Sequence, residues 1–143
     1  MSACTFCGHN DTPDTVRPML TDSIEKLITD NEVDTFYVGT HGSFDRTALS
    51  ALREIKIKYP TINYYVALVY LPEKKDKFPL YTDSETVLPD GIEIHPRRFA
   101  IRYRNKWMVD QSQYLIAYVK NSFGGASKTL DYATKRHLNI VRI

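Results

Sequence analysis

The most constraining feature of this sequence is an apolar run at residues 64–71, which reads YYVALVYL. A strand with one solvent-facing side alternates apolar and polar residues, whereas this run lacks that alternation. The pattern is typical of a strand that is buried beneath helices on both of its faces. We therefore expect a sheet with a helical layer on each side, and we predict one of its strands at residues 62–71.

Segments rich in β-forming residues alternate with segments of helical periodicity. Strands are predicted at residues 3–7, 35–38, 62–71, 114–119 and 139–142. Helices are predicted at residues 12–31, between residue 43 and Pro60, at 97–111 and at 127–137. Asp22 and Glu25 are interpreted as a capping pair of the first helix. Because right-handed crossovers join parallel strands, this order predicts an α/β fold with a mostly parallel, five-stranded sheet and helices on both faces.

The length of the chain suits one domain, so we interpret residues 1–143 as a single unit. Residues 72–96 break the alternation and are rich in Pro, Lys and Asp. We predict that they form an irregular excursion at the edge of a cleft. Such a segment is either a functional flap or a stretch with short elements that the pattern does not show.

Both cysteines, Cys4 and Cys7, lie in the first predicted strand. Residues three apart on a strand point to opposite faces, so no disulfide is expected between them. No second Cys/His pair stands at zinc-finger spacing, and we predict neither a metal nor a cofactor. Two reduced cysteines, no signal-peptide pattern and only short apolar runs favour a cytoplasmic protein that does not enter a membrane.

The formal net charge of +2 gives no global electrostatic reason to bind DNA or RNA. A local basic patch is still indicated, at Arg97, Arg98, Arg102, Arg104 and Lys106. Arginine suits phosphate because its planar guanidinium donates two hydrogen bonds in a fork. We predict that Arg98 and Arg104 supply charge to an anion site and that Asn105 lines its wall. The alternative is a solvated basic face.

Three loops that follow predicted strands are candidates for a ligand site. Ligands of open α/β sheets bind outside the carboxyl ends of the strands, where the strand order reverses. The first loop, at residues 8–10, contributes Gly8 and His9 to the predicted wall of the site.

The second loop lies between a strand and a helix at residues 39–45. Gly39 and Gly42 let the backbone approach a ligand closely, and Thr40 and Ser43 can donate hydroxyl hydrogen bonds. The helix that follows presents free N–H groups, which suit an anionic phosphate. These four residues are predicted to hold one phosphate. A plain turn with a helix cap is the alternative.

The third loop, at residues 122–129, has the same arrangement of a strand, glycines and a helix start. Gly124, Gly125, Ser127 and Thr129 are predicted to line the side of the site that faces the second loop. Two such loops at one sheet edge favour a phosphate site more strongly than one loop does, because a single turn would serve a purely structural need.

Six motifs follow one another over nearly the whole chain: CGH at residues 7–9, FYVGxxGxFD at 36–45, RFAI at 98–101, RNxWMVD at 104–110, IAYV at 116–119 and GGAxKTLxYA at 124–133. Together they resemble a small bacterial branch of the SLOG superfamily. The resemblance implies a Rossmann-like three-layer sandwich that binds a nucleotide, a nucleotide-derived ligand or a nucleic-acid backbone. Many members of the superfamily are thought to be sensors rather than enzymes, so we expect binding or sensing of a phosphorylated nucleotide-like ligand.

An alternative function follows from the lonely-guy phosphoribohydrolases of the same superfamily. Arg104 and Met108 match their Arg-Lys-x-x-Met helix, and Gly124 and Gly125 match the glycine pair of their Pro-Gly-Gly-x-Gly-Thr-x-x-Glu motif. The proline is missing and the acidic position is at best Asp131. If this chain is a nucleotide N-glycoside hydrolase, Arg104 would position the phosphate and Asp131 would assist cleavage.

The superfamily also contains DNA-processing proteins, whose glycine-rich loop resembles residues 39–45. Their likeness implies single-stranded nucleic-acid binding as a second alternative. The low net charge makes that partner less expected than a small nucleotide. A homodimer is compatible with the sequence, because two-fold dimers are common among soluble proteins.

Overall fold

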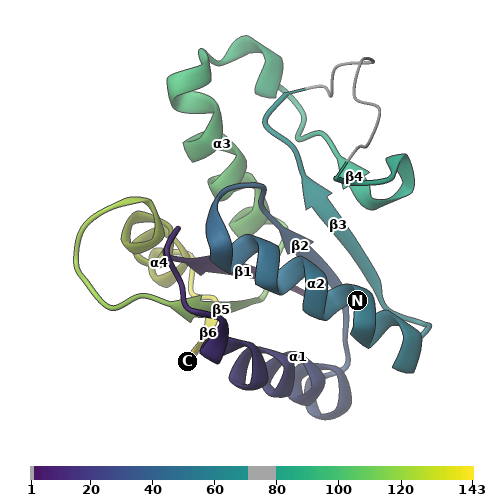
Figure 1. The fold of residues 1–143 in the computed structure, drawn as a ribbon. Helices are drawn as coiled ribbons and strands as arrows, with labels where there is room; N and C mark the ends of the chain where they lie inside the picture. The colour runs from purple at the N-terminus through teal and green to yellow at the C-terminus, as the bar shows by residue number, and fades with distance from the viewer. Residues whose placement is uncertain (1, 71–79) are drawn as a thin grey trace.

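The computed structural model describes residues 2–70 and 80–143 of the chain (Figure 1). Its strands are β1 (Ser2–Gly8), β2 (Val33–Val38), β3 (Asn63–Ala67), β4 (Thr86–Val87), β5 (Tyr114–Tyr118) and β6 (Asn139–Arg142). Its α-helices are α1 (Arg17–Asn31), α2 (Gly42–Lys58), α3 (Arg97–Asp110) and α4 (Gly125–Lys135). Short 3-10 turns at Asp14–Val16, Asp83–Glu85 and Ile92–Ile94 precede α1, β4 and α3.

All six strands are parallel and follow the order β4-β3-β2-β1-β5-β6. The chain builds the sheet outward from β1 to β4 on one side and then returns to place β5 and β6 on the other. The strand order therefore reverses between β1 and β5, as in Rossmann-like folds. The predicted α/β class with a parallel sheet is confirmed. The predicted strand count of five is wrong, because the short strand β4 adds a sixth at the sheet edge.

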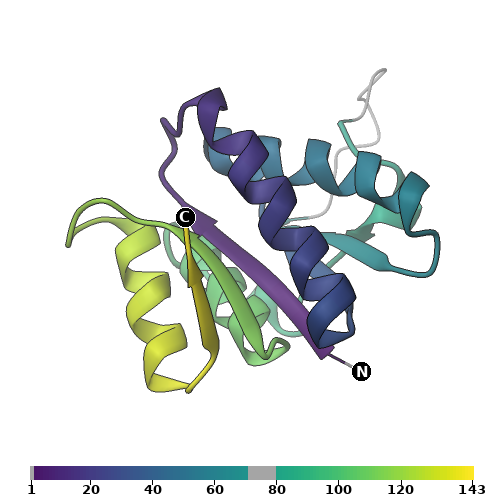
Figure 2. The ribbon, with the colours of Figure 1, turned by 90° about the horizontal axis from the view of Figure 1, so that it is seen from below.

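Two helical layers cover the sheet, as the sequence predicts (Figure 2). The larger core joins β1, β2 and β3 to α1 and α2, and buries Leu20, Phe36 and Phe44 completely. The smaller core joins β1 and β5 to α3 and α4 through Val109 and Leu130. Right-handed crossovers place the helices of the two halves of the sheet on opposite faces.

The two cysteines lie on opposite faces of β1, as expected. Cys4 packs in the larger core and Cys7 in the smaller one, and both are buried free thiols. None of the helices in the described part of the chain is long and apolar enough to cross a membrane.

Two predicted boundaries are wrong by four or five residues for identifiable reasons, and β2 and α4 each begin two residues earlier than predicted. Helix α1 begins at Arg17 with Pro18 in its first turn, where the missing N–H of proline costs no helical hydrogen bond. Asp22 therefore lies inside the helix, where it pairs with Lys26 at 3.1 Å instead of capping. Strand β3 ends at Ala67 and not at residue 71, and the Leu68 amide donates to Val87 O at 2.9 Å as the chain leaves the sheet.

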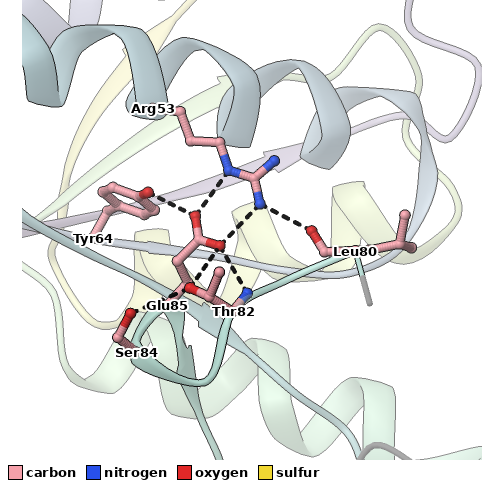
Figure 3. A network of polar contacts seen from close by, with 6 residues as sticks. All are labelled: Arg53, Tyr64, Leu80, Thr82, Ser84 and Glu85. Atoms are coloured by element: carbon pink, nitrogen blue, oxygen red, sulfur yellow. Dashed lines mark hydrogen bonds and ion pairs between the residues drawn. The ribbon is translucent and has the colours of Figure 1, made fainter. Parts of the chain in front are cut away.

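The predicted excursion at residues 72–96 falls partly outside the described residues, which resume at Leu80. From there it carries short elements, and a polar network attaches it to the sheet (Figure 3). Arg53 of α2 donates two hydrogen bonds to the Glu85 carboxylate at 2.8 and 3.0 Å, and Tyr64 of β3 donates a third at 2.7 Å. These donors, with the Thr82 amide, hold the pKa of Glu85 down at about 2.

Candidate functional site

A cleft of about 170 Å³ opens at the carboxyl end of β1, beside the point where the strand order reverses. It is lined by the end of β1, the loop between β2 and α2, the inner side of α3 and the first turn of α4. Its polar or backbone-exposing residues include Gly8, Asn10, His41, Asp45, Arg104, Asn105, Gly125 and Thr129. The three predicted loops and the basic helix thus contribute to one cleft.

Arg104 lies at the floor of the cleft and is only 1% exposed. Its guanidinium donates to Thr40 Oγ1 and to Ala67 O, both at 2.9 Å, and its Nε donates to Asn105 Oδ1 at 2.9 Å. It forms no ion pair within the described residues. Arg104 therefore joins α3 to the ends of β2 and β3, and it brings a buried positive charge to the cleft.

Asp45 lies in the first turn of α2, and its negative charge acts on the Arg104 guanidinium by raising the pKa of that group. Its Oδ2 accepts a hydrogen bond from the His41 amide at 3.0 Å. The residue keeps some contact with solvent through the cleft. Desolvation of the carboxyl raises its pKa to about 6, although Arg104, the His41 amide and Arg46 act in the opposite direction. The protonation state of the Asp45 carboxyl therefore changes close to neutral pH.

His41 completes a chain of hydrogen bonds with Arg104 and Thr40. Thr40 Oγ1 lies 3.0 Å from His41 Nδ1, and one guanidinium nitrogen of Arg104 lies 3.4 Å from the same atom. Because arginine can only donate, Nδ1 is an acceptor and the ring proton is on Nε2. Burial, followed by the charge of Arg104, lowers the pKa of His41, so the ring is neutral at pH 7.

The glycine loop before α2 has mainly internal roles. A Cβ at Gly39 would lie 2.7 Å from Asp45 Oδ2 and 3.2 Å from Arg104 Cζ, so only glycine lets these side chains approach the backbone. Gly42 has a φ of +89°, and a Cβ there would overlap Asn10. Ser43 donates its amide to Asn10 O at 2.9 Å. The sequence predicted that a phosphate would approach the backbone at these glycines, but side chains and backbone of the protein itself occupy that space.

The first turn of α2 is therefore less open to an anion than the sequence suggested. Ser43 Oγ donates to Thr12 O at 2.8 Å, and Asp45 already places a carboxylate beside the first amides of the helix. A negative charge at a helix N-terminus takes the position that a phosphate would occupy. Thr40 is likewise engaged by Arg104.

The N-terminus of α4 is open in contrast. Its N-cap, Gly124, has a φ of +91° and no side chain to cap the helix. The first helical bond runs from the Lys128 amide to Gly124 O at 3.1 Å, so the amides of Gly125, Ala126 and Ser127 have no partner within the helix. Apart from its chain neighbours and the backbone of its own helix, no atom of the described residues lies within 4 Å of a Cβ at Gly125, which lines the cleft.

Several predicted site residues lie outside the cleft lining. His9 turns toward Tyr118 and accepts the Lys120 amide at 2.8 Å on Nε2. Ser127 is buried, and Gly124 is exposed above the cleft. Arg98 and Asp131 line a separate groove of about 560 Å³ between the outer sides of α3 and α4.

Asn10, His41 and Asp45 are polar side chains of the cleft lining that were not among the site residues predicted from the sequence. Asp45 ends the FYVGxxGxFD motif, and an acidic residue in the first turn after a glycine loop was a signal that could have identified it. Cys7 also reaches the cleft. Burial, with the Asp45 charge, raises the pKa of its thiol to about 12, so it is not a thiolate nucleophile at neutral pH.

No family model matches the chain, and no curated protein matches it.

Proposed function

We propose that this chain is a SLOG-type domain that binds or senses a phosphorylated, nucleotide-like ligand in the cleft beside β1. The observation that carries the proposal is the uncapped start of α4, which shares the cleft with the buried guanidinium of Arg104. Free helix amides and a nearby positive charge are the combination that stabilises a bound phosphate. The cleft also stands where open α/β sheets bind their ligands.

In this proposal the phosphate accepts hydrogen bonds from the backbone amides of Gly125 and Ala126, and the positive charge of Arg104 stabilises the phosphate electrostatically. Arg104 is held by protein acceptors, so it acts chiefly as a fixed charge and not as a flexible clamp. Asn105 Oδ1 already accepts from Arg104, which leaves the amide nitrogen of Asn105 as a donor toward the ligand. Thr129 Oγ1 donates to Gly125 O at 3.0 Å and supports the turn.

Asp45 and His41 would meet the sugar or the base. A carboxylate accepts hydrogen bonds from sugar hydroxyls, and the Nε2–H of His41 is a donor. Because Asp45 would repel a phosphate placed beside it, its position orients the ligand, with the phosphate toward α4 and the uncharged part toward α2.

Thermal-shift measurements test the proposal with the nucleoside mono-, di- and triphosphates, ADP-ribose and a short single-stranded oligonucleotide. A ligand at about 100 times its dissociation constant stabilises the fold by roughly 2.7 kcal/mol. The Gly125→Val variant adds a branched side chain at a cleft-lining residue whose backbone accepts any residue, and it should abolish the shift. Thr134→Val, at the other end of α4, is the matched control.

A positive shift that Gly125→Val removes and Thr134→Val keeps would support the cleft as the binding site. A shift that survives in Gly125→Val would place the ligand elsewhere. If only the oligonucleotide shifts the melting temperature, and its affinity falls steeply with salt, the alternative of single-stranded nucleic-acid binding replaces the proposal.

A nucleotide N-glycoside hydrolase is the second candidate, and the position of Asp45 favours it. Asp131 is exposed in the groove between α3 and α4, whereas Asp45 lies in the cleft. The pKa of Asp45 is about 6, close to the neutral pH at which a general base works best. In such a reaction Asp45 would take a proton from water as the water oxygen bonds to the sugar carbon and the bond from that carbon to the base nitrogen breaks. Asp45 would then give this proton to the departing base. Release of free base from a nucleoside monophosphate, lost in Asp45→Asn and kept in Asp131→Asn, is the expected result.

A further inference from the structure

A second hollow adjoins the cleft. The groove of about 560 Å³ between α3 and α4 shares Ile101, Asn105, Gly125 and Thr129 with the cleft, so the two hollows border on each other along these residues. A ligand whose phosphate lies on the first turn of α4 is therefore at the border of the groove. The proposed function does not use this groove.

The groove is strongly basic although the chain is nearly neutral. Five cations line it, against the single carboxylate of Asp131: Arg98, Arg102, Lys106, Lys128 and Lys135. The whole chain has a net charge of only +2. The excess of positive charge is thus concentrated beside the candidate site and balanced by negative charge elsewhere.

These five cations differ from most of those on the opposite face of the sheet, although Arg46 and Lys56 of α2 also form no ion pair with a described carboxylate. On α1 and α2, Arg17, Lys26, Arg53 and Lys58 each pair with a carboxylate, at 2.8 to 3.2 Å. None of the groove cations forms an ion pair within residues 2–70 and 80–143. Two of them lie over aromatic rings, Arg98 over Phe99 and Lys106 over Tyr132.

The spacing of the cations produces a stripe. Arg98, Arg102 and Lys106 stand four residues apart on α3, so they lie on one side of the helix and span about 12 Å. Like charges at this spacing destabilise a helix. Across the groove, Lys128 and Lys135 of α4 face the stripe. A stripe of this length exceeds the separation of adjacent phosphates in a diphosphate.

We propose that the ligand of the cleft carries a second phosphoryl group, separated from the first by a sugar, and that the α3–α4 groove binds this group. The inference rests on the proposed function, because it extends the ligand from the first turn of α4 into the groove. Arginine recognises phosphate through two parallel hydrogen bonds, and Arg102 is exposed for such a contact. The second phosphoryl group belongs either to a nucleoside 3′,5′-bisphosphate or to the next nucleotide of a short chain.

Titration calorimetry on the full chain separates these ligands. The probes are the four ribonucleoside 5′-monophosphates, their 5′-diphosphates, their 3′,5′-bisphosphates and 5′-phosphorylated dinucleotides. At least one bisphosphate or dinucleotide is expected to bind about tenfold tighter than its monophosphate, the effect of one charge-assisted hydrogen bond. The diphosphate should gain less, because its second phosphate stays within the cleft.

The double variant Arg102→Gln/Lys135→Gln tests the location of the second group. It should remove the preference for the second phosphoryl group and leave monophosphate affinity unchanged. Lys26→Gln/Lys58→Gln removes the same charge from α1 and α2 and should keep the preference. A preference that survives in the groove variant overturns the inference.

The outcomes also separate this inference from the proposed function. If monophosphates bind and a second phosphoryl group adds nothing, the proposed function stands and the groove inference fails. If neither monophosphates nor doubly phosphorylated probes bind, both fail together. A preference that disappears equally in the groove variant and in the control would reflect net charge alone and would also overturn the groove inference.

Discussion

Replacement of Asp45 by asparagine tests the charge balance of the cleft without changing its volume. Burial raises the pKa of this carboxyl from 3.8 to about 6. One pKa unit corresponds to about 1.4 kcal/mol, so the difference amounts to about 3 kcal/mol. The folded state holds the proton more tightly than the unfolded chain. This contribution to stability is therefore complete below the ordinary pKa of 3.8 and is lost as the pH rises through about 6.

The Asp45→Asn variant lacks this dependence and keeps an oxygen for the His41 amide. Its free energy of unfolding relative to the parent should rise by about 2.5 kcal/mol between pH 4 and pH 8, because a small part of the effect is already present at pH 4. Urea denaturation followed through the fluorescence of Trp107 measures both proteins at each pH. Asp11→Asn removes a charge from an exposed loop, and its difference should stay within about 0.5 kcal/mol. A difference for Asp45→Asn that is constant with pH would refute the desolvation of Asp45.

Three further changes test other parts of the structure. Glu85→Gln should lower the free energy of unfolding by at most about 3 kcal/mol at pH 7. The lowered pKa of Glu85 stabilises the fold above the ordinary carboxyl pKa of 4.5, and this stabilisation is lost as the pH falls through about 2. Denaturation at pH 7 and at pH 2 checks the sign. Gly8→Ala would overlap the Phe44 ring and should destabilise by about 1–3 kcal/mol in thermal melts, whereas Gly125→Ala meets no atom within 4 Å and should not destabilise the fold. The Cys7 thiol should react with a thiol reagent only when the fold opens, so its rate should rise with denaturant; fast reaction in native buffer would contradict its burial.

The fold was predictable because the signals that determine it are local and repeated. The apolar run at residues 64–71 indicated burial on both faces, and the alternation of strands and helices fixed the parallel sheet. The missed strand β4 has two residues and pairs with β3 through Val66 and Ala67. A pair of residues has no periodicity, so only the network around Glu85 reveals why the chain stays at that edge.

The sequence predicted which loops form the candidate site, but it did not predict the role of each residue in them. Residue types and strand order placed Arg104 and Gly125 at the same edge of the sheet. They could not show that Thr40 and Ser43 have their hydroxyls engaged within the protein, because those partners lie 64 and 31 residues away along the chain. Arg98 and Arg104 were both predicted to supply charge to the site, yet α3 exposes Arg98 and buries Arg104.

The sequence predicted a phosphate-binding role for both glycine loops, at residues 39–45 and 122–129, but the structure gives them different roles. Asp45 supplies the negative charge at the start of α2, and Gly39 leaves the room in which Asp45 and Arg104 approach the backbone. The start of α4 has no acidic residue in its first turn and no side-chain cap. An anion that enters the cleft meets repulsion on the α2 side and free amides on the α4 side. In the proposed binding mode, the position of this one carboxylate is what directs the phosphorylated end of the ligand away from α2 and toward the α3–α4 groove.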